Sequence, residues 1–208
     1  MSIEKAYVAL SGIFDPWVAL MESHTRRMEV RDSELHEAKI LVISAPTDGG
    51  IAALTEANAR GQSVLLCFSV EIEDIAQRYC RRRDIRNLAT VVAPFFHVPS
   101  DDEEFDAVYA NCFFDFCDPA AVDGVVDEIW RVLKQEGHLY SVHMGRPSRT
   151  VGRLWEWVLR RLPPGNGFRP ASVAPCLVER GFHLVRDEAP ERLGFPLRYI
   201  QAKKAKDT

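Results

Sequence analysis

The chain alternates short apolar runs with longer segments in which apolar residues recur at helical spacing. The short runs predict strands at residues 40–43, 64–68, 88–93, 105–110 and 138–144. The fully apolar, branched run at 40–43 predicts a strand buried on both faces, and that at 64–68 a second buried strand. The longer segments predict helices at residues 51–60, 72–83, 118–133, 151–162 and 170–180, with a leading helix that begins at Asp15-Pro16. Two last strands, at residues 182–187 and 197–203, are predicted to pair as an antiparallel hairpin.

Strands that alternate with helices in this way predict an α/β fold, with a doubly wound, mostly parallel sheet as the middle of three layers. The length of 208 residues suits one domain. Within it we expect a helical segment at residues 1–38, on the sheet edge or over a pocket, a core at residues 39–203 and a frayed tail at residues 204–208.

The charge balance and the cysteine count narrow the class of protein. A net charge of -4 and a pI ≈ 5.9 give no support to nucleic-acid binding, which usually shows as a basic domain or stripe. No apolar run approaches the roughly 18 residues of a membrane span, and the first residues lack the features of a signal peptide. Five cysteines without framework spacing predict a reduced, cytoplasmic protein.

The loop after the first strand is the main candidate for binding a ligand. Residues 44–50 read Ser-Ala-Pro-Thr-Asp-Gly-Gly and lie between the strand at 40–43 and a predicted helix. A strand, a loop of small residues and a helix are typical of a site for a nucleotide-like ligand at the carboxyl edge of a parallel sheet.

Three stretches in the middle of the chain follow a family pattern. They are an acidic turn and strand at 102–108 (Asp-Glu-Glu-Phe-Asp-Ala-Val), Asp118-Pro119, and a helix-to-strand turn at 128–139 (Glu-Ile-Trp-Arg-Val-Leu-Lys-Gln-Glu-Gly-His-Leu). Gly181-Phe182 stands where the pattern has its last hairpin. By these motifs, over residues 14–203, the chain resembles the class I S-adenosylmethionine-dependent methyltransferases, and most closely the type 11 group that includes ubiquinone and menaquinone biosynthesis methyltransferases.

The resemblance implies a methyltransferase-like Rossmann fold with seven strands, one of them antiparallel, and S-adenosylmethionine as the cofactor. It also implies methyl transfer to a small hydrophobic or aromatic acceptor. Members of the family hold the cofactor with a glycine loop after the first strand, an acid at the end of the second strand and an acid after the third. The two acids meet the ribose hydroxyls and the adenine amino group.

The chain departs from all three anchors. Ser44-Ala45-Pro46 replaces the glycines, Phe68-Ser69 ends the second strand, and Ala93-Pro94 follows the third. Two functions therefore stay open. In one, displaced acids such as Asp48 and Glu71 hold the cofactor of a working enzyme. In the other, the cleft is filled with side chains, and a degenerate methyltransferase fold acts as a binding or interaction protein, or on another ligand.

Candidate site residues are assigned on this basis. The cofactor-binding candidates are Ser44, Asp48, Gly49, Gly50, Ser69, Glu71 and Asn111. His97 or His143 is the candidate general base, although a lone histidine in such a setting is more often structural. The candidates for binding substrate are Phe96, Phe113 and Phe114, with Arg146 for an anionic group. The alternatives are a phenylalanine core packed on the leading helix and a solvated basic loop.

Cysteine and tryptophan pairs indicate further contacts. Cys112 and Cys117 form either a metal or redox pair or, more commonly, two buried thiols, and no metal site is predicted. Trp155 and Trp157 cannot share one helix face, so one of them is expected to be exposed, or covered by a second copy, a lid contact or a ligand. We therefore expect a small-molecule acceptor or a protein partner, and a homodimer.

Overall fold

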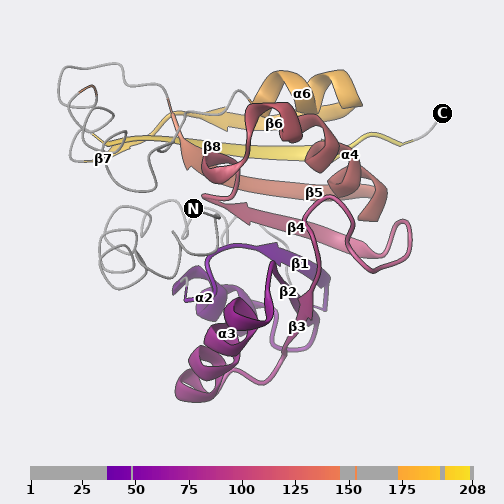
Figure 1. Ribbon diagram of the computed structural model, residues 1–208. Helices are drawn as coiled ribbons and strands as arrows, with labels where there is room; N and C mark the ends of the chain where they lie inside the picture. The colour runs from indigo at the N-terminus through magenta and orange to yellow at the C-terminus, as the bar shows by residue number, and fades with distance from the viewer. Residues whose placement is uncertain (1–36, 48, 146–152, 154–172, 193–194, 207–208) are drawn as a thin grey trace.

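A computed structural model describes residues 37–47, 49–145, 153, 173–192 and 195–206 (Figure 1). The predicted leading helix, most of the predicted helix at 151–162, and the start of the predicted helix at 170–180 lie outside these residues. Asp48, Arg146, Trp155 and Trp157 lie outside them too. None of the described helices is long and apolar enough to cross a membrane.

The described elements follow the predicted alternation of strands and helices. The strands are β1 (Lys39–Ile43), β2 (Gln62–Cys67), β3 (Leu88–Val92), β4 (Phe105–Asn111), β5 (Leu133–Met144), β6 (Phe182–Glu188), β7 (Glu191–Arg192) and β8 (Phe195–Lys204). The α-helices are α2 (Gly49–Ala57), α3 (Val70–Arg83), α4 (Val122–Val132) and α6 (Val173–Arg180). Two 3-10 turns, η1 (Phe114–Phe116) and η2 (Pro119–Ala121), lie between β4 and α4.

The sheet has the order β3-β2-β1-β4-β5-β8-β6, and the short β7 pairs with β8. β1 to β5 pair in parallel with their neighbours, whereas β8 runs antiparallel to both β5 and β6. This arrangement confirms the predicted doubly wound sheet with an antiparallel C-terminal hairpin. The parallel strands β1 to β5 therefore all end at one edge, and their loops meet there.

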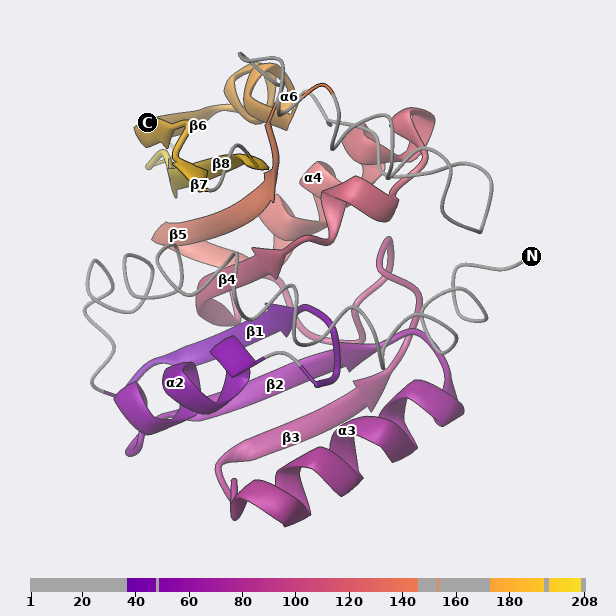
Figure 2. The same ribbon diagram turned by 90° about the vertical axis from the view of Figure 1, so that its left-hand side faces the viewer.

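Side chains that alternate along the strands pack into two hydrophobic cores, one on each face of the sheet. Leu41 and Val108 pack with residues of α4 and α6, and Ile40 and Val42 pack with residues of α2 and α3. Figure 2 shows α2 and α3 beside β1, β2 and β3, and α4 and α6 beside the other half of the sheet. Burial on both faces explains why the central strands read as unbroken apolar runs.

The passage from α4 to β5 differs from the prediction. The sequence predicts a turn at residues 136–137 and a strand from 138, but α4 passes directly into β5 at Leu133. Glu136 has a φ of 65° inside that strand, and the β4–β5 register shifts next to it. The extra residues are therefore a bulge within the strand. At the other end of the sheet β8 includes Lys204, one residue into the tail that was expected to fray.

Candidate functional site

The loops at the carboxyl edge of β1 to β5 carry the site residues that the sequence predicts within the described part of the chain. Ser44 follows β1 in the predicted loop, whereas Gly49 and Gly50 already form the start of α2. Ser44 and Gly50 are buried and Gly49 is exposed, so the small residues of this loop lie close against the sheet. At positions 49 and 50 no side chain covers the backbone at the start of α2.

Three phenylalanine rings from neighbouring loops form a triad (Phe68, Phe95 and Phe113). Phe68 follows β2, Phe95 follows β3 and Phe113 follows β4. The ring centroids of Phe68 and Phe95 are 5.8 Å apart, those of Phe68 and Phe113 5.9 Å, and those of Phe95 and Phe113 5.4 Å. These are the separations of favourable aromatic pairs. The triad places an aromatic surface across the carboxyl ends of three strands.

Two further predicted aromatic residues touch this triad from opposite sides. Phe96 is 61% exposed, and its ring lies 5.5 Å from that of Phe95. Phe114 is buried, and its ring lies 5.4 Å from that of Phe113. Of the predicted substrate residues, the exposed Phe96 is thus the one that offers most surface to a ligand. Phe95, which contacts Phe96, and Phe68, for which no binding role was predicted, are the rings that connect the cluster.

The end of β2 carries no carboxylate on its last residue. Cys67 stands there, fully buried, and burial raises its pKa to about 12, so that the thiol stays neutral. Phe68 follows it. The first ionised group beyond is Glu71, which is exposed at the start of α3.

Ser69 and Glu71 form a polar pair at this helix start. Ser69 is the N-cap of α3, and its Oγ accepts a hydrogen bond from the Ile72 backbone N–H at 3.4 Å. A hydrogen bond from the Ser69 side chain lowers the pKa of Glu71. The neighbouring Glu73 instead accepts a 2.6 Å hydrogen bond from Thr90 of β3. Of these two acids, Glu71 is therefore the one that is available to a ligand.

The loop after β4 begins with a strained turn. Asn111, a predicted cofactor residue, is buried at the end of the strand. Cys112 next to it has a φ of 51°, an uncommon conformation for a residue with a side chain, and its N–H donates to the Val142 oxygen at 2.7 Å. Such strain often accompanies functional loops.

All five cysteines of the chain are free thiols. Burial raises the pKa of Cys117 to about 12, and Asp115 adds to that effect, so the thiol is unreactive. Within the described ranges no group of three or more His, Cys, Asp and Glu side chains could hold a metal ion.

The two histidines predicted as alternative bases lie in very different environments. His97 is exposed in the turn after β3. His143, near the end of β5, is 1% exposed, and its Nδ1 lies 3.3 Å from Ser141 Oγ. Three strands separate β3 from β5, so their ends are about 19 Å apart at about 4.8 Å per strand. His97 and His143 therefore lie at different parts of the carboxyl edge of the sheet.

Residues 46–141 match a family model described as a methyltransferase domain. The match runs from the loop after β1 to the middle of β5 and so includes the triad and the start of α3. The match identifies a methyltransferase domain in these residues. No curated protein matches the chain significantly.

Solved structures share the fold of this chain at low sequence identity. One is a chain of the complex between the Haloferax volcanii Trm112 methyltransferase activator and a proposed methyltransferase, with 16% identity, a TM-score of 0.80 and coverage of 100% of this chain and 99% of that one. A second is an S-adenosylmethionine-dependent methyltransferase from Aquifex aeolicus, with 15% identity, a TM-score of 0.72 and coverage of 95% and 97%. The cyclase SpnF also aligns, with 15% identity, a TM-score of 0.70 and coverage of 88% and 81%. A cyclase among these neighbours means that the fold alone does not decide the activity.

The residues at this edge of the sheet fit S-adenosylmethionine unevenly. The small residues after β1 suit its methionine portion, and the partly exposed ring of Phe95 offers an apolar surface to its adenine. No acid stands at the end of β2 to accept hydrogen bonds from the ribose hydroxyls. The candidates for this role are Ser69 and Glu71, at the start of α3. The fit is thus complete only if these two residues replace the missing anchor.

Proposed function

We propose that the chain binds S-adenosylmethionine at the carboxyl edge of its sheet and transfers the methyl group to a small hydrophobic or aromatic acceptor. The observation that carries the proposal is the Ser69–Glu71 pair beside Phe68. The hydrogen bond from Ser69 favours the ionised carboxylate of Glu71, and the N-terminus of α3 favours it as well. An ionised carboxylate is the group that accepts hydrogen bonds from two neighbouring ribose hydroxyls.

The chain's own residues would divide the work by position. Ser44, Gly49 and Gly50 approach the methionine portion through their backbone, and Ser69 and Glu71 accept from the ribose. The cofactor, when bound, supplies an activated methyl group. Phe96 and Phe114 orient an apolar acceptor, and such catalysis depends mainly on proximity and alignment. His97, in water, accepts a proton from an acceptor that must lose one, and the buried His143 is the alternative base.

Calorimetric titration of the purified chain with S-adenosylmethionine and S-adenosylhomocysteine tests the proposal. We expect micromolar binding, weakened about tenfold or more in Glu71→Ala because charge-assisted hydrogen bonds are lost. Asp74→Ala is the matched control, since Asp74 is another exposed acid of α3. No heat at millimolar ligand from a folded protein would exclude this function.

A second function is favoured by the end of β2. Cys67 and Phe68 occupy the place of the family's ribose acid, and the triad covers the adjoining strands. We propose as the alternative a degenerate methyltransferase fold that binds an apolar ligand or a protein through Phe96 and the triad. Saturable binding of an aromatic ligand that Phe96→Ala abolishes, without any binding of S-adenosylhomocysteine, would favour it.

The cellular compartment and the binding partners of the protein are also proposals. Five free thiols suit a reduced, cytoplasmic environment. The Haloferax neighbour comes from a complex with an activator protein, which makes a small protein partner a reasonable expectation beside a homodimer. Light scattering of the purified chain, alone and with candidate partners, measures both.

A further inference from the structure

The loop at residues 93–104, between β3 and β4, carries Phe95, Phe96 and His97. At its start the Ala93 N–H donates to the Cys67 oxygen at 3.0 Å, which ties the loop to β2. The His97 N–H then donates to the Pro94 oxygen at 3.0 Å and closes a tight turn. The position of the Phe95 ring in the triad thus depends on what holds the far side of this turn.

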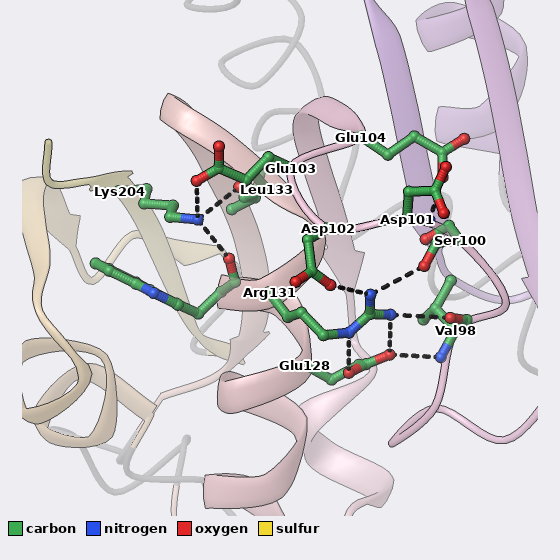
Figure 3. A network of polar contacts seen from close by, with 11 residues as sticks. Val98, Ser100, Asp101, Asp102, Glu103, Glu104, Glu128, Arg131, Leu133 and Lys204 are labelled. Carbon is green, nitrogen blue, oxygen red and sulfur yellow. Dashed lines mark hydrogen bonds and ion pairs between the residues drawn. The ribbon is translucent and has the colours of Figure 1, made fainter. Parts of the chain in front are cut away.

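Val98 lies on the far side of this turn. One ion pair on α4 forms hydrogen bonds with both of its main-chain polar groups. Its N–H donates to Glu128 Oε1 at 2.6 Å, and its oxygen accepts from Arg131 Nη2 at 3.0 Å. Figure 3 shows the two side chains converging on Val98 from the helix. The pair offers Val98 one acceptor and one donor, as a neighbouring β-strand would.

Glu128 and Arg131 are themselves locked together. Arg131 Nε donates to Glu128 Oε2 at 2.9 Å, and Arg131 Nη2 donates to Glu128 Oε1 at 2.8 Å. Arg131 Nη1 reaches further along the loop, to the Ser100 oxygen at 2.9 Å and to Asp102 Oδ1 at 2.7 Å. A bidentate fork of this kind fixes orientation as well as distance.

The pair stands on a rigid support. Val125, Ile129 and Val132 of the same helix are all at most 2% exposed, so α4 is fixed in the core. The side chain of Val98 is itself buried in that core. Residues 94–97 are therefore held between a strand on one side and a helix-borne ion pair on the other. Their geometry is set from outside the site.

We propose that Glu128 and Arg131 are positioning residues, which hold the turn at residues 94–97 so that Phe95 completes the triad and the ligand surface. The proposal rests on the proposed function insofar as that ligand is S-adenosylmethionine. Neither residue touches the ligand. Their contribution passes through Val98, and without it Phe95 leaves Phe68 and Phe113.

Hydrogen exchange and ring shifts measured by NMR on the full chain test the proposal without any ligand. In Arg131→Met we expect the Val98 amide to exchange about tenfold faster or more, while the amides of Leu41 and Val108 keep their wild-type rates. The Phe95 ring signals should move toward positions free of neighbouring rings. Glu128→Gln should show a smaller effect, because its amide oxygen still accepts from Val98.

The matched control is Asp127→Asn. It breaks an ion pair of the same helix, between Asp127 and Arg180 of α6, that does not involve the loop, so Val98 and Phe95 should behave as in the wild type. Equal acceleration of all amides in Arg131→Met, or an unchanged Phe95 signal, would overturn the proposal, because the pair would then be ordinary structural support.

Titration with S-adenosylhomocysteine separates this proposal from the proposed function. If the wild type binds it, Arg131→Met should bind at least about fivefold more weakly and Asp127→Asn equally well. Equal affinity in Arg131→Met, with Val98 released, would contradict the positioning role. If the wild type shows no binding, the proposed function fails, and the exchange and ring measurements still decide the role of the pair.

Discussion

Lys204 donates a hydrogen bond from Nζ to the main-chain oxygen of Leu133, at 2.8 Å and across 71 positions of the sequence. Its Nζ also lies 3.2 Å from Glu103 Oε1 (Figure 3). A further hydrogen bond runs from Nζ to the Trp130 oxygen at 2.9 Å. Because α4 passes into β5 without a loop, the last carbonyls of the helix need donors from elsewhere. The end of β8 supplies them and thereby ties the last strand to the helix.

Removing the hydrogen bonds of Lys204 should lower the stability of the fold. In Lys204→Met a buried and a partly buried carbonyl lose their donor, and we expect the free energy of unfolding to fall by about 2–3 kcal/mol. Lys203→Met is the control, since Lys203 forms only a half-exposed ion pair with Glu136, and its denaturation midpoint should hardly change. Urea unfolding of both variants measures the difference. Equal midpoints would show that the Lys204 contacts contribute nothing net.

Gly181 takes a backbone conformation that other residues rarely adopt. Its φ is +110°, and a Cβ at this position would lie 3.1 Å from the Trp130 ring. Gly181→Ala should therefore destabilise the fold by about 1–3 kcal/mol. Gly124→Ala is the opposite control, because a Cβ at this exposed helical position meets nothing within 4 Å. We expect it to stabilise by about 0.5–1 kcal/mol. Thermal unfolding that shifts both variants in the same direction would contradict this account.

Local periodicity predicted the sheet well because its central strands are apolar on both faces. The runs at 40–43 and 105–110 differ from the observed β1 and β4 by one residue each. The turn at residues 136–137 was wrong because the pairing of Leu133 with Phe105 extends β5 back to the end of α4. That pairing joins distant residues, and no local pattern in the sequence signals it.

The candidate site was predictable only in part, for a similar reason. The order of strand and loop places Ser44, Ser69 and Phe113 at the carboxyl edge without any knowledge of side-chain contacts. The partners within that edge follow from the order of the strands in the sheet, so the contact of Phe68 with Phe95 stayed hidden. Arg131 belonged to a recognised motif, but its bonds to Val98 become apparent only once the helix packs against the loop.

Phe113 of the triad and its neighbour Phe96 should differ in whether their loss affects stability or ligand binding. Phe113 is 6% exposed and touches three other rings, so Phe113→Ala should cost about 3–4 kcal/mol. Phe96 is largely exposed, and Phe96→Ala should leave stability nearly unchanged while weakening the binding of an apolar acceptor. Chemical denaturation and acceptor titration of both variants make the comparison. A large loss of stability in Phe96→Ala would place this ring in the core instead.

The buried His143 makes stability depend on pH. Burial lowers its pKa to about 4 from the usual 6.5; Arg198 lowers it further and Asp187 opposes the shift. Below pH 6.5 the unfolded chain gains a proton at this side chain, whereas the folded chain gains it only near pH 4. The free energy of unfolding should therefore fall as the pH drops through this window. The shift corresponds to about 3–4 kcal/mol in total.

A variant without a titrating group isolates this contribution. His143→Gln keeps a polar side chain beside Ser141 but cannot take up a proton, so its stability should decline less between pH 6.5 and pH 4 than that of the wild type. His97→Gln is the control, because His97 is exposed and should leave the slope unchanged. Urea unfolding across this range measures all three slopes. If the stability of His143→Gln and that of the wild type fall equally with pH, the imidazole has the same pKa in the folded and the unfolded chain. That result is incompatible with its burial between Phe114 and Ser141.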